Sequence, residues 1–212
     1  MNDVVIRPLR FTDQVAEMRA FLETLGLQAR IESARSSDWV DMLAGRGMVA
    51  LHSAASSSTG GKPGQTDLSF EAEDVDRLKE KFEQAGYADA VIWDEAYGRV
   101  LRVAGPDGVH IHIDERSDDL YGYKLNETRP DERWLVTPQL DRTEESAWRG
   151  FLEVVGLDAL ARFGDGVRLE LTTSEDLAAV HSRLAAAGYQ AVQVADTIEI
   201  TDPDGQTVVV HG

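Results

Sequence analysis

Three side chains that can exchange protons or bind metals alternate along one short segment of the chain. His110, His112 and Asp114 are separated by apolar residues, an alternation that predicts a strand with its two faces of opposite character. A fully buried sheet rarely carries three such polar groups in a row on one face. We therefore expect this face to border a cavity.

A tight turn introduces that strand and recurs near the end of the chain. In Gly105-Pro-Asp-Gly108 the proline presets one dihedral angle, the aspartate caps the turn and the last glycine allows a positive φ. Asp202-Pro-Asp-Gly205 repeats the pattern. Its strand carries a histidine only at His211, to which the sequence assigns no role.

Other segments repeat in the same order. Arg19–Leu27 and Arg149–Leu157 are identical at six of nine positions, and Pro8 falls on Pro138 at the same offset. Each copy then continues with a predicted helix. An aspartate stands at its start, Asp74 or Asp176, and an Ala-Gly-Tyr sequence follows at its end. The C-terminal half is therefore interpreted as a second copy of the N-terminal half.

The second copy is shorter, and the missing length can be placed. Gly26 and Leu68 lie 42 positions apart, whereas Gly156 and Leu169 lie 13 apart, a difference of 29. The lost residues correspond to the predicted strands of Trp39–Leu43 and Met48–His52 and the Ser-rich loop after them. The C-terminal half is thus expected to have too few strands to close a cup.

Composition narrows the classes of function. The hydrophobic fraction of 42% supports a packed core, and the absence of cysteine excludes disulfides and thiolate chemistry. The net charge of −17 argues against nucleic-acid binding and is compatible with a cationic ligand. No apolar run spans a bilayer and no signal-peptide pattern opens the chain, so we expect no membrane association and a cytoplasmic location.

The repeated strand–helix–three-strand unit, with its Phe-Leu-x-x-Leu-Gly-Leu helix end and Pro-Asp-Gly turn, resembles the vicinal oxygen chelate superfamily. That group includes glyoxalase I, extradiol dioxygenases and bleomycin resistance proteins. The resemblance implies an α+β fold of paired βαβββ modules that form cup-shaped mixed sheets with helices outside. Residues 1–115 would be a complete domain (modules 1–58 and 66–115), 116–133 a linker, and 134–212 a degenerate tandem copy lacking several strands.

The resemblance also implies positions for metal ligands inside the cup. The first-strand ligand falls on Ile6 or Arg7, neither of which is a usual ligand. The other positions fall on Asp67 and His112, and the matching strand of the first unit offers His52. Imidazole and carboxylate groups suit Zn, Fe, Mn or Ni. In the second copy the corresponding residues are Arg168 and Val209, so that half is expected to bind no metal.

Further residues are predicted to line the cup. Aromatic walls with a few polar groups are typical of small-molecule sites. The candidate ligand-binding residues are Trp39, Trp93, Tyr97, Arg99 and His110. Arg99 is expected to point inward. The alternative for each is core packing or a position at a solvated edge.

Two functions follow. We favour a small-molecule binding protein, monomeric or homodimeric, that holds a cationic or aromatic ligand without an essential metal. The alternative is an enzyme, a divalent-metal-dependent lyase or dioxygenase acting on vicinal oxygens. A third possibility is that the shortened half only packs against the N-terminal half, as a second subunit does in dimeric relatives.

Overall fold

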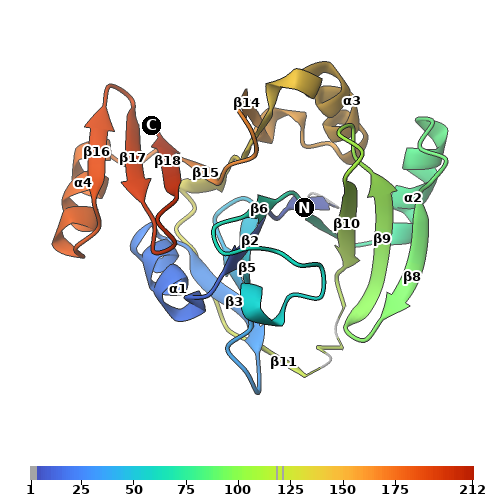
Figure 1. The fold of residues 1–212 in the computed structure, drawn as a ribbon, viewed down its shortest axis with the longest axis horizontal. Helices are drawn as coiled ribbons and strands as arrows, with labels where there is room; N and C mark the ends of the chain where they lie inside the picture. Colours follow the sequence, from blue (N-terminus) through green and yellow to red (C-terminus); the bar gives the residue numbers. More distant parts are fainter. Residues whose placement is uncertain (1–3, 118, 121) are drawn as a thin grey trace.

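The computed structural model describes residues 4–117, 119–120 and 122–212 (Figure 1). The first strand is broken at Arg7-Pro8 into β1 (Val4–Ile6) and β2 (Leu9–Thr12). β1 pairs antiparallel with β7 (Phe70–Ala72), whereas β2 pairs parallel with β5 (Met48–Ser53). Because the two pieces belong to different sheets, the break joins both walls of the N-terminal half.

The first wall, sheet A, has the strand order β1-β7-β10-β9-β8. Its remaining strands are β8 (Val91–Glu95), β9 (Gly98–Ala104) and β10 (His110–Glu115). Helix α2 (Val75–Gln84) lies against its outer face, where Leu78 and Phe82 are buried (Figure 1). The opposite, concave face therefore carries the alternate residues of each strand.

The second wall, sheet B, has the order β11-β3-β4-β5-β2-β6. It contains β3 (Gln28–Ser33), β4 (Trp39–Leu43), β6 (Thr66–Asp67) and β11 (Tyr123–Leu125), and α1 (Val15–Thr24) packs beside it. β11 belongs to the segment predicted as a linker. That segment thus adds an edge strand to the cup instead of only connecting the two halves.

The C-terminal half is smaller, as the missing length predicts. Sheet C has the order β12-β15-β18-β17-β16, and β13 and β14 form a separate two-stranded sheet. The strands are β12 (Trp134–Val136), β13 (Gln139–Asp141), β14 (Arg162–Gly164), β15 (Glu170–Thr173), β16 (Ala191–Val194), β17 (Thr197–Thr201) and β18 (Thr207–His211). The helices are α3 (Glu145–Val155) and α4 (Leu177–Ala186), and short 3-10 helices span Ala54–Ser56, Arg142–Glu144 and Asp158–Leu160.

Several elements of the two halves follow the same order along the chain. The break between β12 and β13 at Thr137-Pro138 matches the break at Arg7-Pro8, and each break precedes a helix of the repeated motif. Asp74 and Asp176 both accept a hydrogen bond at the start of a helix. Both Pro-Asp-Gly turns form, with φ +77° at Gly108 and +76° at Gly205.

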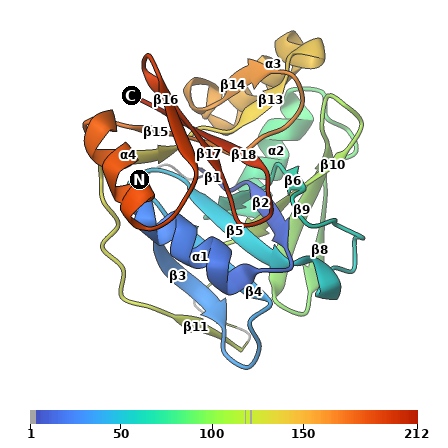
Figure 2. The same ribbon diagram turned by 60° about the vertical axis from the view of Figure 1, so that its left-hand side comes forward.

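The two halves share one core of buried apolar residues. Trp148 of α3 is 2% exposed and its ring approaches Gly105 of the N-terminal turn. The turn between β17 and β18 reaches β2, where Arg10 pairs with Asp202 (Figure 2). Among the described residues, no helix is both long and apolar enough to cross a membrane. Residues 4–115 and 134–212 thus pack against each other.

Candidate functional site

A buried arginine stands where the two walls of the N-terminal cup meet. Arg7, 4% exposed, lies at the break between β1 and β2 and pairs with Asp114 of β10. Its guanidinium is 3.9 Å from Asp41 of β4, and its Nε donates to Ser69 Oγ at 3.4 Å. Burial alone would lower the pKa of Arg7, but Asp114 and Asp41 raise it above its ordinary value. The floor of the cup therefore holds a permanent positive charge.

The carboxyl groups of Asp41 and Glu71 complete this floor, and their pKa values are shifted in opposite directions. Burial raises the pKa of Asp41 to about 6, although Arg7 acts to lower it, and Trp39 Nε1 donates to Asp41 at 3.1 Å. Glu71 accepts from Arg30 and Arg116, each at 2.7 Å. Burial raises the pKa of Glu71, but the two arginines lower it overall. Glu71 is thus held ionised, whereas Asp41 titrates near neutral pH.

Two tyrosines lie over these charges. Burial, followed by the charge of Asp114, raises the pKa of Tyr97 to about 12. Burial, followed by the charge of Asp41, raises the pKa of Tyr123. Tyr97 is 44% exposed, so it stands at the rim. Both phenols stay protonated at neutral pH and can donate hydrogen bonds into the cup.

The outer part of sheet A presents an aromatic and cationic surface. The Arg102 guanidinium lies 4.7 Å from the centroid of the Trp93 ring, and the His112 ring lies 6.2 Å from it. Burial lowers the pKa of His112, against the influence of Asp114. His110, two residues earlier in β10, is exposed on the same face. The predicted ligand-binding residues Trp93 and His110 therefore share the concave face.

The structure does not bring His52, Asp67 and His112 together. His52 lies between the rings of Phe11 (5.6 Å) and Trp39 (5.3 Å), and its Nδ1 is 2.7 Å from Ser53 O. Asp67 accepts from Gln65 Nε2 at 2.9 Å in the edge strand β6. In the described part of the chain these three do not form a group with ligand atoms within 4.8 Å of one another. Metal binding by them stays a prediction.

Two side chains that meet Arg7 lie close in sequence to predicted ligands. Ser69 and Asp114 are each two residues beyond one of them. Asp114 shares a face of β10 with His112, because alternate residues of a strand point the same way. Asp67 lies in β6, whereas Ser69 lies between β6 and β7. The metal-ligand roles of Asp67 and His112 therefore stay predictions.

Arg99 corrects a further expectation, because it does not point into the cup. Val100 and Arg102 pair with Asp114 and His112 on the concave side, so Arg99 faces α2. There it donates to both carboxylate oxygens of Asp76 at 2.8 Å and to Glu115 at 3.2 Å. Attraction to two carboxylates on the helix side fixes its direction.

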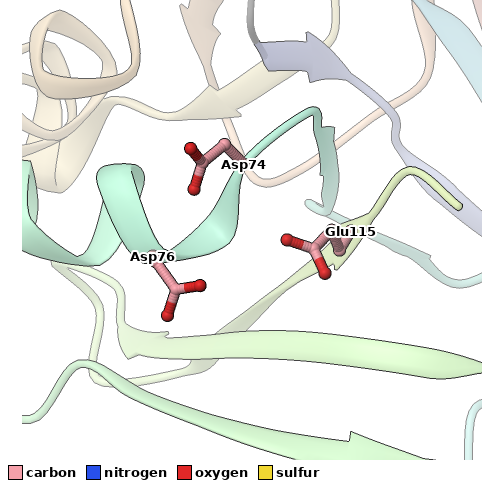
Figure 3. Close-up of side chains that lie close together, drawn as sticks. All are labelled: Asp74, Asp76 and Glu115. Atoms are coloured by element: carbon pink, nitrogen blue, oxygen red, sulfur yellow. The ribbon is translucent and has the colours of Figure 1, made fainter.

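Those carboxylates belong to a cluster that sequence reasoning missed. Asp74, Asp76 and Glu115 offer ligand atoms within 4.8 Å of one another (Figure 3). Their number and chemistry could hold a divalent ion. However, Asp74 accepts from Arg77 N at 2.9 Å, and Arg99 neutralises the other two. The cluster thus lies outside the cup and is charge-paired.

The C-terminal half has its own polar pair at the equivalent place. Arg7 N and Thr137 N donate to Ser69 O and Glu170 O, respectively, so these positions correspond. His211, in β18, lies with its Nε2 2.7 Å from Glu170 Oε2, and Glu170 is 2% exposed. The sequence drew attention to Arg168 and Val209 instead, one register step away. Arg168 Nε donates to Glu170 at 2.9 Å.

The metal implied by the resemblance can be tested against these residues. In the N-terminal cup the convergence point holds a guanidinium, which cannot coordinate a cation, and it already neutralises Asp114. That donor set does not fit a metal. In the C-terminal half, Glu170 supplies a carboxylate and His211 an imidazole, which are usual ligands of divalent metals. The position that corresponds to Arg7 holds the hydroxyl of Thr137, which is not a usual ligand. The donor set therefore fits a divalent metal only in part.

Two surface hollows lie outside the cup. One, of about 590 Å³, is lined by residues of both halves that include Thr24, Glu175 and Arg183. The other, of about 390 Å³, lies beside the start of α2. In the first, Arg183 pairs with Glu175 at 2.9 Å, and the lining residues Glu23 and Asp131 pair with Arg19 and Arg133, which lie outside the lining.

Comparison with known proteins supports the fold. No family model and no curated protein sequence matches the chain. A catechol 2,3-dioxygenase structure matches with a TM-score of 0.64 and 13% identity, covering 98% of this chain and 86% of the other. The Mn(II)-bound glyoxalase of Novosphingobium aromaticivorans matches with a TM-score of 0.59 and 13% identity, covering 99% and 81%.

A third match has the same character. The 2,2',3-trihydroxybiphenyl 1,2-dioxygenase of Sphingomonas wittichii matches with a TM-score of 0.61 and 12% identity, covering 98% of this chain and 88% of the other. Glyoxalases and extradiol dioxygenases are the groups named by the sequence resemblance, and each of these matches covers nearly the whole chain. The chain therefore has the fold that these dioxygenases and this glyoxalase share, with an ion pair where the two walls of its N-terminal half meet.

Proposed function

We propose that the chain is a small-molecule binding protein whose N-terminal cup holds a planar ligand without a metal. The observation that carries the proposal is the buried Arg7, paired with Asp114 and close to Asp41. The guanidinium supplies the positive charge at the position where the resemblance places a metal ligand. Because its partners are already neutralised, the floor has no need of a second cation.

The walls of the cup support a flat ligand. Trp39 stands on sheet B, whereas Trp93 and Tyr97 belong to sheet A, and all three keep part of their rings accessible. Aromatic walls with few polar groups bind planar molecules through large contact areas. Similar structures include a catechol 2,3-dioxygenase and a homoprotocatechuate 2,3-dioxygenase in complex with 3,4-dihydroxyphenylacetate, a small aromatic compound. We propose the same size class here.

The ion network restricts where such a ligand can lie. The floor of the cup is filled by Arg7, Asp41, Glu71 and their partners. The ligand would therefore rest on the part of sheet A around Trp93, Arg102 and His112, which we call the shelf. In that position it would contact Trp93 and His112 and reach the Tyr97 hydroxyl at the rim. The ligand thus meets the protein mainly through aromatic surface.

Binding with and without a chelator tests the proposal. Catechol and 3,4-dihydroxyphenylacetate would be titrated into the purified protein, with heat and the Trp93 indole N–H resonance as readouts. We expect at least one to bind equally well after EDTA treatment. Trp93→Ala should weaken binding about tenfold through lost contact area, and Val192→Ala on sheet C should not. Loss of binding with EDTA would contradict the proposal.

The second candidate is a divalent-metal-dependent lyase or dioxygenase, favoured by the Glu170–His211 pair. A bound divalent ion would act as a Lewis acid on vicinal oxygens of a substrate. Glu170 and His211 would hold it, and Arg168 would orient Glu170. Metal analysis of the purified protein and of His211→Ala tests this candidate. Stoichiometric metal in the wild type and its loss in the variant would favour it over the binding protein.

A further inference from the structure

Arg102 differs from Arg7, Arg30 and Arg116 because it pairs with no carboxylate in the described part of the chain. Arg7, Arg30 and Arg116 each pair with a carboxylate. Within the residues that the structure describes, Arg102 makes no ion pair, and its Nε is buried without a hydrogen-bond partner. A buried donor left unpaired is costly unless a ligand or water satisfies it. Arg102 is therefore suited to a partner that residues 4–117, 119–120 and 122–212 do not supply.

The neighbours of Arg102 make its surroundings aromatic and apolar. His112 is its cross-strand neighbour on β10, and Val91 is its neighbour on β8. The guanidinium stacks on Trp93 at 4.7 Å. Val91, 38% exposed, leaves apolar surface beside the charge. The Arg102 guanidinium, the His112 imidazole and the apolar surface of Trp93 and Val91 thus lie side by side on one face of sheet A.

Two acidic groups lie nearby, and both have other partners. Asp114 pairs with Arg7 on the cup floor. Glu95 accepts from Trp93 Nε1 at 2.8 Å. Neither forms an ion pair with Arg102 among the described residues. The uncompensated charge of this shelf is therefore positive, although the chain carries a net charge of −17.

A guanidinium with free donors recognises an oxyanion best, since its fork matches the two oxygens of a carboxylate. We propose that Arg102, with His112 and Trp93, forms a subsite for the carboxylate of an organic anion whose apolar body lies against Trp93 and Val91. This inference rests on the proposed binding function and specifies the charge of its ligand. It reverses the expectation of a cationic ligand that the net charge suggested.

Three probes of nearly equal size test the charge preference. Phenylacetate is an anion, phenylacetamide is its neutral analogue and phenethylamine is a cation. Each would be titrated calorimetrically into the full chain and followed through the Trp93 indole resonance, identified with Trp93→Phe. We expect phenylacetate to bind at least tenfold more tightly than the amide and the amine to bind weakest. Added salt should weaken the binding of phenylacetate.

Variants of one strand separate local recognition from overall charge. Arg102→Gln should remove the preference for phenylacetate, and Arg102→Lys should keep part of it, because it retains the charge without the fork. Arg99→Gln is the matched control, since it removes the same charge from the opposite face of β9. It should leave the affinity for phenylacetate unchanged within twofold. Circular dichroism would confirm that each variant is folded.

The outcomes distinguish this inference from the function on which it rests. Equal affinity for acid and amide, or an unchanged preference in Arg102→Gln, overturns the subsite. If both probes still bind and Trp93→Ala weakens both, the proposed binding function stands. If none of the three probes, nor catechol, shifts the Trp93 resonance at millimolar concentration, both are overturned.

Discussion

The ring of Tyr189 lies edge-on against the ring of Phe21, with centroids 5.1 Å apart and planes at 71°. Tyr87 meets Phe151 in the same way, at 5.6 Å and 87°. Phe21 and Phe151 occupy the same place in the two repeated helices, and the tyrosines occupy the same place in the two Ala-Gly-Tyr motifs. The repeated residues therefore pair reciprocally across the two halves.

The first prediction concerns this interface. Phe151 is buried against Phe70, Phe82, Tyr87 and Trp148. Phe151→Ala should lower the free energy of unfolding by about 3–5 kcal/mol, because a buried ring leaves a cavity. A double-mutant cycle between Phe21 and Tyr189 should show a coupling of about 0.5–1.5 kcal/mol. Urea unfolding measures both, and strictly additive effects would contradict the edge-on contact.

The second prediction concerns the buried pair between β2 and the C-terminal turn. Arg10 pairs with Asp202 and lies 3.4 Å from Asp204, and the side chains of all three are at most 3% exposed. Arg10→Met should cost about 3–5 kcal/mol of stability, since two carboxylates stay buried without a cation. Arg19→Met, which breaks a surface pair with Glu23, should cost under about 1 kcal/mol. Similar losses in the two variants would rule out the buried role of Arg10.

The third prediction follows from the position of Arg7. Arg7→Gln leaves Asp41 and Asp114 facing each other without their cation, which should cost about 3 kcal/mol or more. A divalent cation such as Mn²⁺ should then raise the melting temperature of the variant more than that of the wild type. Thermal unfolding with and without Mn²⁺ makes the comparison. An equal shift in both proteins would show that Arg7 does not stand in for a cation.

The fourth prediction is a pH dependence set by Asp41. Its pKa of about 6 in the folded protein lies above its ordinary value of 3.8 because the carboxyl is buried. The folded protein therefore binds a proton that the unfolded chain has released between these values. The stability that this proton contributes is complete below about pH 4 and is lost as pH rises through 6.

Asp41→Asn cannot ionise and keeps an acceptor for Trp39. It should exceed the wild type in stability at pH 8 by about 2–3 kcal/mol, from the size of the shift. The difference should vanish near pH 4. Chemical unfolding at a series of pH values gives both curves, and a constant difference between them would exclude Asp41 as the titrating group.

Sequence reasoning reached the elements that depend on local patterns. The helix of Arg19–Leu27, the aspartate at the start of α2 and the Pro-Asp-Gly turns were all predicted, because periodicity and turn chemistry act over a few residues. The smaller number of strands in the C-terminal half was predicted from the difference in length between the two halves. These features carry their own signals in the chain.

The contents of the cup lacked such a signal. Arg7 and Asp114 lie 107 positions apart, and nothing local to either residue predicts their pairing. The alternation of polar residues predicted that His110, His112 and Asp114 share one face of β10, but it carried no signal that Asp114 would be the residue that pairs with Arg7. Asp41 lay within a predicted strand beside Trp39, and its burial depends on sheet A closing over it.

The contact between Arg10 and Asp202 joins residues 192 positions apart. During synthesis, β2 leaves the ribosome long before the turn that neutralises Arg10 has been translated. Until that turn has been made, Arg10 lacks the carboxylates with which it pairs in the folded protein. This buried contact between the two halves can therefore form only late in synthesis, after residues 202–204 have emerged from the ribosome.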